Sequence, residues 1–183
     1  MRLFFAVELP PSVQAALGRL NPRDDNRDYR WSEPSLLHVT LAFLGEQPAE
    51  RLEVLQQVGT AAAAASRAGA LSLGEAGSFG SPRAPRVLWV GFYGDLQALQ
   101  NLQASLDAGL RHAGFQVEDR PFRPHVTLAR RREQARGGPP AGWPPSERPR
   151  HPAFAMDRLT LFESRLSPRG PTYTPLCHFE LGG

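Results

Sequence analysis

The pentapeptide HVTLA occurs at residues 38–42 and again at residues 125–129, and this repeat decides how the chain of 183 residues is interpreted. A repeat of this length within one chain indicates a duplicated structural unit. Each copy is therefore expected to occupy the same place in one of two related lobes.

Each copy has the composition of a β-strand, in which successive side chains point to opposite faces. Alternation puts the histidine, the threonine and the last alanine of each copy on one face: His38, Thr40 and Ala42 in the first, His125, Thr127 and Ala129 in the second. The opposite face is apolar and is expected to be buried; in the first strand it carries Leu37, Val39, Leu41 and Phe43. Each copy would then present a histidine beside a threonine on its less apolar face.

The remaining segments alternate between strand and helix patterns, which indicates an α+β protein of two related lobes. Helices are expected at residues 10–20, 48–69 and 95–114, the last with Asp95 as its cap. The polar segment 21–30 is rich in turn residues, and 133–152 contains too much proline and glycine for regular structure, so it should form a long surface loop. Further strands are expected at 2–9, 35–46, 70–75, 86–93, 122–130, 159–166 and 172–181.

The composition is that of a globular protein, with 41% hydrophobic and 21% charged residues, enough to bury a core. Cys177 is the only cysteine, so no disulfide can form within the chain and a cysteine-based zinc site is excluded. The apolar run before Glu8 is too short for a signal peptide or a membrane span. These features predict a cytoplasmic protein that does not bind membranes.

All 21 Lys and Arg residues are arginine, and they are unevenly distributed. Residues 1–110 contain 9 Arg against 11 acidic residues, whereas residues 111–183 contain 12 Arg against 7. A basic C-terminal half fits a polyanionic partner, although codon bias explains the preference for arginine, and a solvated surface explains any single one equally well.

Two histidines facing each other suit phosphodiester cleavage. Unperturbed histidine titrates at about pH 6.5, so one imidazole can act as a base while its partner, still protonated, acts as an acid. Displacement at phosphorus needs both, together with hydroxyl donors for the non-bridging oxygens, and it needs no metal or nucleotide cofactor. The sequence has no phosphate-binding glycine loop, no HExxH motif and no GxSxG motif, and two histidines without a third ligand make a poor zinc site.

Five segments carry a resemblance to a known family: RLFFAVELP, RWSEPSLLHVTLAFLGE, PRVLWVGF, FRPHVTLAR and LFESRLSPRGPTYTPL. Together they resemble the two-histidine phosphoesterases, in the branch of RNA 2',3'-cyclic phosphodiesterases once named 2'-5' RNA ligases. The resemblance implies a single domain over residues 1–183, with two pseudo-symmetric lobes around a central cleft. Each lobe would be a mainly antiparallel sheet with helices on the outside. The implied reaction opens a terminal 2',3'-cyclic phosphate to a 2'-phosphate.

The resemblance also implies a role for each residue of the repeated motif. His38 would be the acid that protonates the departing 3'-oxygen, and His125 the base that activates water. Thr40, Thr127 and the arginine at the end of the second motif, Arg130, would hold the phosphate. Strict alternation, however, puts Arg130 on the face opposite His125, and Arg123, which shares the parity of His125, is the rival for this contact.

The expected partners are RNA ends with a 2',3'-cyclic phosphate, tRNA fragments among them, or small cyclic nucleotides, and no protein partner is predicted. Two other functions stay open. The reverse reaction would join RNA ends through a 2'-5' linkage, and a non-catalytic module would only bind RNA or a nucleotide. The paired histidines disfavour the module, because binding alone does not need two groups that titrate near neutrality.

Overall fold

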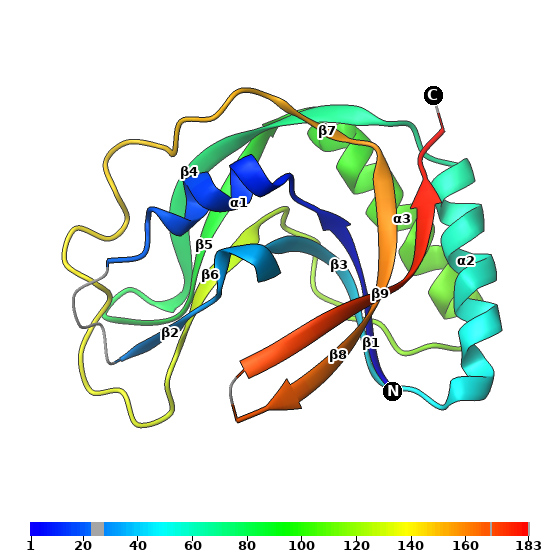
Figure 1. Cartoon of the computed structure of the whole chain (residues 1–183), viewed down its shortest axis with the longest axis horizontal. Helices are drawn as coiled ribbons and strands as arrows, with labels where there is room; N and C mark the ends of the chain where they lie inside the picture. Colours follow the sequence, from blue (N-terminus) through cyan, green and yellow to red (C-terminus); the bar gives the residue numbers. More distant parts are fainter. Residues whose placement is uncertain (23–27, 169, 183) are drawn as a thin grey trace.

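Two antiparallel sheets form the frame of the computed structural model (Figure 1), which describes residues 1–22, 28–168 and 170–182. Sheet A has the strand order β3-β1-β8-β9 and sheet B the order β2-β6-β5-β4-β7. The strands of sheet A are β1 (Arg2–Glu8), β3 (His38–Glu46), β8 (Arg158–Ser167) and β9 (Gly170–Glu180). The strands of sheet B are β2 (Tyr29–Trp31), β4 (Gly69–Ser81), β5 (Ala84–Gly94), β6 (Val126–Arg131) and β7 (Phe154–Met156).

The two sheets correspond strand by strand, and the repeated pentapeptide lies at equivalent places in them. Strand β3 pairs with β1 and leads on to β8 and β9, just as β6 pairs with β5 and leads on to β4 and β7. The short strand β2 is an addition at the edge of sheet B. This arrangement confirms the expected α+β fold with two related lobes.

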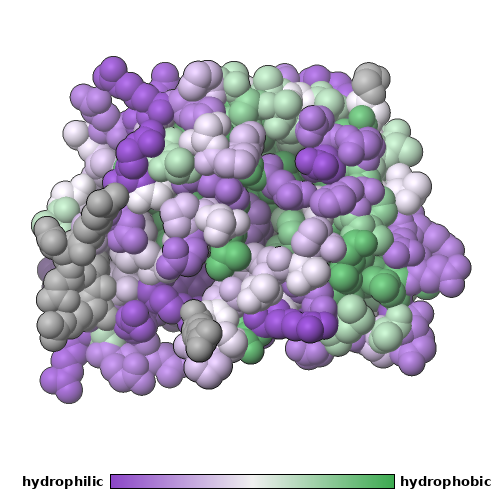
Figure 2. Space-filling model, viewed as in Figure 1, coloured by the Kyte–Doolittle hydropathy of each residue, from purple (hydrophilic) through white to green (hydrophobic). Residues whose placement is uncertain are grey.

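The structure has three α-helices in the described residues: α1 (Pro11–Gly18), α2 (Leu52–Ala64) and α3 (Leu96–His112). Helices α2 and α3 contact each other, α2 contacts β8 and β9, and α3 contacts β3, so both lie beside sheet A (Figure 1). Helix α3 shows why the periodicity of its sequence was informative, because its leucines recur every three or four residues and form one fully buried stripe. These are Leu99, Leu102, Leu106 and Leu110. Hydrophilic residues cover most of the face of the molecule shown in Figure 2.

Three expectations about the elements need correction. Strands β2 and β7 were not expected, because three residues are too few to show a period. Strand β4 continues to Ser81 and forms a hairpin with β5, beyond the expected end at residue 75. Asp95 occupies the cap position of α3, but its carboxylate accepts a hydrogen bond from the Ala70 amide at 2.9 Å and none from the helix.

Residues 132–153 contain no helix or strand, which confirms the expected long loop, and its first part is anchored to the sheet. The Asp28 carboxylate accepts hydrogen bonds from the amides of Arg136 at 2.9 Å and Gly137 at 3.1 Å. The Trp143 indole donates to the Gly77 carbonyl at 3.3 Å. Residues 23–27 of the expected turn-rich segment lie outside the described residues.

A β-bulge interrupts both copies of HVTLA at the same residue, the leucine. In the ladder with β1, Thr40 pairs with Ala6 and Ala42 with Phe5, so Leu41 is the extra residue. In the ladder with β5, Thr127 pairs with Trp89 and Ala129 with Leu88, so Leu128 is the extra residue. A bulge shifts the alternation of the residues that directly follow it, here Ala42 and Phe43 in β3 and Ala129 and Arg130 in β6.

The prediction from strict alternation is therefore wrong beyond each bulge. Ala42 and Ala129 turn toward the buried side, where Ala129 packs with Leu88. Phe43 turns the other way, stacks on Phe4 at 5.5 Å between ring centroids and is 48% exposed, so it belongs to the face of His38.

Candidate active site

His38 has one nitrogen tied to the backbone and one directed to Thr40. Its Nδ1 donates a hydrogen bond to the Leu36 carbonyl at 2.7 Å, and its Nε2 lies 3.0 Å from the Thr40 hydroxyl. A carbonyl oxygen only accepts, so Nδ1 must carry a proton. The Nε2 of neutral His38 then accepts from Thr40 and is the nitrogen free to exchange a proton.

His125 repeats this arrangement in the other sheet. Its Nδ1 donates to the Arg123 carbonyl at 2.6 Å, which is again the residue two positions earlier in the chain. The tautomer is therefore the same as that of His38, and Nε2 is the basic nitrogen. The two imidazoles, one at each sheet, are thus held in the same tautomer by a hydrogen bond to the carbonyl two residues earlier.

Aromatic rings surround each imidazole on what we call the site face of its sheet. Around His38, the ring centroids of Phe4, Tyr173 and Phe162 lie at 4.9, 5.2 and 6.3 Å. Around His125, the centroids of Phe79 and Trp89 lie at 5.0 and 6.4 Å. Phe162 lies opposite Phe4 of β1, and Phe79 lies opposite Val87, the residue of β5 that corresponds to Phe4. Phe162 and Phe79 therefore occupy equivalent places in the two walls.

These surroundings lower the pKa of both imidazoles below the usual histidine value. The main cause for both His38 and His125 is burial, which disfavours the charged ring, and the positive charge of Arg130 adds to it. The hydrogen bond to the carbonyl acts in the opposite direction on each ring. Both histidines therefore favour the neutral form at pH 7 and gain protons only at lower pH.

Arg130 lies on the site face of sheet B because of the bulge at Leu128. It pairs with Val87 of β5. Val87 lies two residues before Trp89 on this strand, so both residues point to the site face, and so does Arg130. Its charge acts on His38 and Tyr173 of sheet A as well as on His125, so the two site faces lie within electrostatic reach of each other. Strands β3 and β6 are also in contact.

Arg123, the rival candidate, contributes its backbone carbonyl to His125. Its side chain is exposed, and its charge is not among the causes that shift the pKa of either imidazole. The structure thus separates the two arginines: Arg130 acts on the site through its charge and Arg123 through its backbone.

The aromatic walls were not expected from the sequence. Phe4, Phe162 and Phe79 are apolar residues in strands, and their composition does not distinguish a wall of the site from a core position. The alternation of side chains along a strand could have revealed one of them. Phe4 lies between Leu3 and Phe5, so its side chain must point to the face of β1 opposite to theirs.

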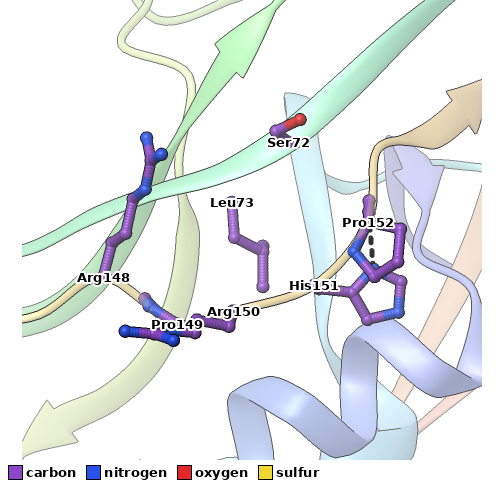
Figure 3. Close-up of a pocket in the computed structure, with 7 residues that line it drawn as sticks. All are labelled: Ser72, Leu73, Arg148, Pro149, Arg150, His151 and Pro152. Atoms are coloured by element: carbon purple, nitrogen blue, oxygen red, sulfur yellow. Dashed lines mark hydrogen bonds between the residues drawn. The ribbon is translucent and has the colours of Figure 1, made fainter.

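Two further histidines have hydroxyl partners of their own, one on β8 and one on α1. His178 contacts the Thr160 hydroxyl at 3.1 Å, and His151 contacts the Ser12 hydroxyl at 3.0 Å. His151 also lines a pocket of about 430 Å³ between β4 and the loop, shown in Figure 3, which includes neither His38 nor His125.

Two other kinds of feature are absent from the described residues. Within these ranges, no group of three or more His, Cys, Asp or Glu side chains is placed to hold a metal ion. None of the helices in the part of the chain that the structure describes is long and apolar enough to cross a membrane.

Comparison with known proteins gives consistent matches over the whole chain. The model of the family described as the 2'-5' RNA ligase superfamily matches residues 9–166. An RNA 2',3'-cyclic phosphodiesterase of Thermus thermophilus is 34% identical over 100% of this chain and 91% of its own length. A protein of the same name from Escherichia coli is 30% identical over 98% of this chain and 96% of its own length.

Solved structures agree with these matches. The crystal structure of the Thermus thermophilus protein TT0787 superposes with a TM-score of 0.83 at 33% identity, covering 99% of this chain and 98% of that one. The structure of E. coli LigT complexed with 3'-AMP gives a TM-score of 0.81 at 28% identity, covering 100% of this chain and 98% of that one.

Proposed function

The chain belongs to the 2'-5' RNA ligase superfamily, and on this premise we propose that it is an RNA 2',3'-cyclic phosphodiesterase that uses His38 and His125 as acid and base. The reaction adds water to a terminal 2',3'-cyclic phosphate and leaves a 2'-phosphate. The observation that carries the proposal is the matching geometry of the two imidazoles. Each has Nδ1 tied to a carbonyl and Nε2 available for proton transfer, one on each site face.

The two histidines divide the proton transfers. Neutral His125 removes a proton from water through Nε2 as the oxygen of that water attacks phosphorus. Protonated His38 donates its Nε2 proton to the departing 3'-oxygen. After one turnover His125 is protonated and His38 is neutral, so proton exchange with solvent restores the starting state.

Three side chains hold the phosphate during this transfer. Thr40 and Thr127 donate their hydroxyl hydrogens to the non-bridging oxygens, and the Arg130 guanidinium balances their negative charge. In the free protein the Thr40 hydroxyl is bonded to neutral His38. Once His38 is protonated, Nε2 no longer accepts, and the hydroxyl is released to bind a phosphate oxygen.

Both lobes must act together, because each supplies one histidine and one threonine. This supports treating residues 1–183 as a single two-lobed domain. The reverse reaction, 2'-5' ligation, would use the same residues in the opposite roles, but abundant water favours hydrolysis.

The test is mass spectrometry of a short synthetic RNA with a 2',3'-cyclic phosphate end, before and after incubation with the protein. We expect a gain in mass of one water molecule, with ³¹P NMR identifying a 2'-phosphate. His38→Ala and His125→Ala should lose this activity, whereas His112→Ala, an exposed histidine at the end of α3, serves as the matched control and should keep it. An unchanged RNA with the wild-type protein would refute the proposed function.

A further inference from the structure

Arg30 stands directly opposite Arg130 in the ladder between β2 and β6, so the two arginines share a face. Both side chains are exposed. Like charges directly opposite each other destabilise a pair of strands, so this arrangement does not serve the stability of the sheet. It concentrates positive charge beside the phosphate-binding residue.

Arg2 brings a third positive charge from sheet A. It lies in a row across the sheet, opposite Ser164, which in turn lies opposite Tyr173. The Arg2 guanidinium is 5.8 Å from the centroid of the Phe43 ring, on the site face. Its neighbour across the other ladder is Glu46, whose carboxylate lies 3.4 Å from the N-terminal ammonium of Met1.

The three charges converge on Tyr173. Burial raises the pKa of the Tyr173 hydroxyl, while the charges of Arg130, Arg30 and Arg2 lower it, so all three guanidinium groups lie near this one side chain from two sheets. Within the described residues, none of these three arginines has a carboxylate within 4.0 Å, whereas Arg158 and Arg165 of sheet A each pair with a carboxylate of their own sheet. Unneutralised arginines at the mouth of an active site favour an anionic ligand.

A single cyclic phosphate accounts for one of these charges only. Arg130 is proposed to meet the reacting phosphate, which leaves Arg2 on the site face of sheet A and Arg30 on the site face of sheet B. A cyclic mononucleotide has no further phosphate for them, whereas an RNA chain has a phosphodiester at each preceding nucleotide. Arginine binds such groups through two parallel hydrogen bonds.

We propose that Arg2 and Arg30 form a subsite for the phosphodiester that precedes the terminal nucleotide, which makes the protein selective for polynucleotide ends over cyclic mononucleotides. This inference rests on the proposed function. It assigns a role to one residue in each sheet, outside the repeated motif.

The experiment compares kcat/KM on two substrates that differ by one nucleotide: adenosine 2',3'-cyclic phosphate and the diadenosine dinucleotide with the same cyclic end. Arg2→Gln and Arg30→Gln should each lower kcat/KM on the dinucleotide roughly 10-fold, the low end for a lost charged hydrogen bond. On the mononucleotide each should stay within about twofold of wild type, because exposed charges are largely screened. Arg19→Gln, which changes an exposed arginine at the C-terminal cap of α1, is the control with the same loss of charge.

Three further measurements test the nature of the contact. Adenosine 5'-phosphate 2',3'-cyclic phosphate should recover most of the advantage of the dinucleotide, because it supplies the preceding phosphate without a second base. The slope of log kcat/KM against log salt on the dinucleotide should become shallower by about 0.7 in each variant. Arg30→Lys, which keeps the charge, should restore part of the activity.

Equal losses on both substrates, or no loss on either, would overturn the subsite. Thermal unfolding of each variant shows whether a loss reflects folding. If the wild-type protein does not hydrolyse either substrate, the proposed function fails, and fluorescence anisotropy with a labelled RNA ending in a 2'-phosphate tests the subsite by itself. Weaker binding by Arg2→Gln and Arg30→Gln than by Arg19→Gln would support it, and equal binding would overturn it.

Discussion

Replacing Arg130 by Gln should move the whole pH profile of the reaction to higher pH. Burial lowers the pKa of His38 and of His125, and the charge of Arg130 lowers both further. Without that charge the pKa of each imidazole rises, although burial still holds it down. A higher pKa of the base moves the acidic limb of kcat/KM upward, and a higher pKa of the acid moves the alkaline limb upward by the same reasoning.

The size of the loss in rate follows from the contact that Arg130 is proposed to make. A hydrogen bond to a charged group contributes about 1.5–3 kcal/mol, which corresponds to roughly 10- to 150-fold in kcat/KM. The loss should be largest on the acidic side of the profile, because there the variant keeps His125 protonated while the wild-type base is already free. At higher pH the variant should recover part of the difference.

The assay is kcat/KM on a cyclic mononucleotide from about pH 4.5 to 9, a range that covers both limbs of a histidine pair. Arg123→Gln is the matched control, since Arg123 contacts His125 through its backbone carbonyl and the substitution leaves that carbonyl in place. An unshifted profile for Arg130→Gln would refute the electrostatic argument. An equal shift for Arg123→Gln would show that the charge of either arginine reaches the histidines and would reopen the choice between them.

Three further predictions concern the pair and its surroundings. His38→Ala and His125→Ala should each lose about 10²- to 10⁴-fold in rate, and the double variant should lose less than the product of the two single losses. A substrate with a nitrophenyl leaving group should rescue only His38→Ala, whereas rescue of His125→Ala would reverse the two roles. Excess EDTA should leave kcat unchanged, since the proposed acid, base and hydroxyl donors need no metal; lost activity restored by zinc or magnesium would contradict this mechanism. Gly77→Ala should lower both kcat and the melting temperature, because the added Cβ would lie 2.5 Å from the Trp89 ring. Gly91→Ala, whose Cβ would lie 3.5 Å from the same ring, should change both quantities only slightly. Equal effects of the two substitutions would reject this steric account.

The long elements of the fold could be predicted because their sequences carry a clear pattern. The leucines of α3 recur at helical spacing and form its buried stripe, and β1 is marked by an unbroken apolar run from Leu3 to Val7, all of it buried. Strands β2 and β7 have no such signal. They are three residues long, and their pairing with β6 and β4 depends on residues distant in the sequence.

The candidate site was predictable up to the bulges. His38, Thr40, His125 and Thr127 precede the extra leucine in each copy, so alternation places them correctly. Phe43 and Arg130 follow it, and each lies on the face opposite to the one that alternation predicts. A bulge is defined by the partner strand, and the partner residues Ala6 and Trp89 lie far from the motif in the sequence.

The shared bulge also explains how a duplicated scaffold gives an asymmetric site. In both copies it turns the residue five positions after the histidine onto the site face, and that residue is Phe43 in sheet A and Arg130 in sheet B. One wall therefore offers an aromatic ring and the other a positive charge, although the backbones are equivalent. Since Arg130 lowers the pKa of both histidines, a residue of one lobe would adjust the proposed acid and the proposed base together. The repeat thus supplies the proposed proton-transfer pair, and the second residue after each bulge would distinguish the two sides of the substrate.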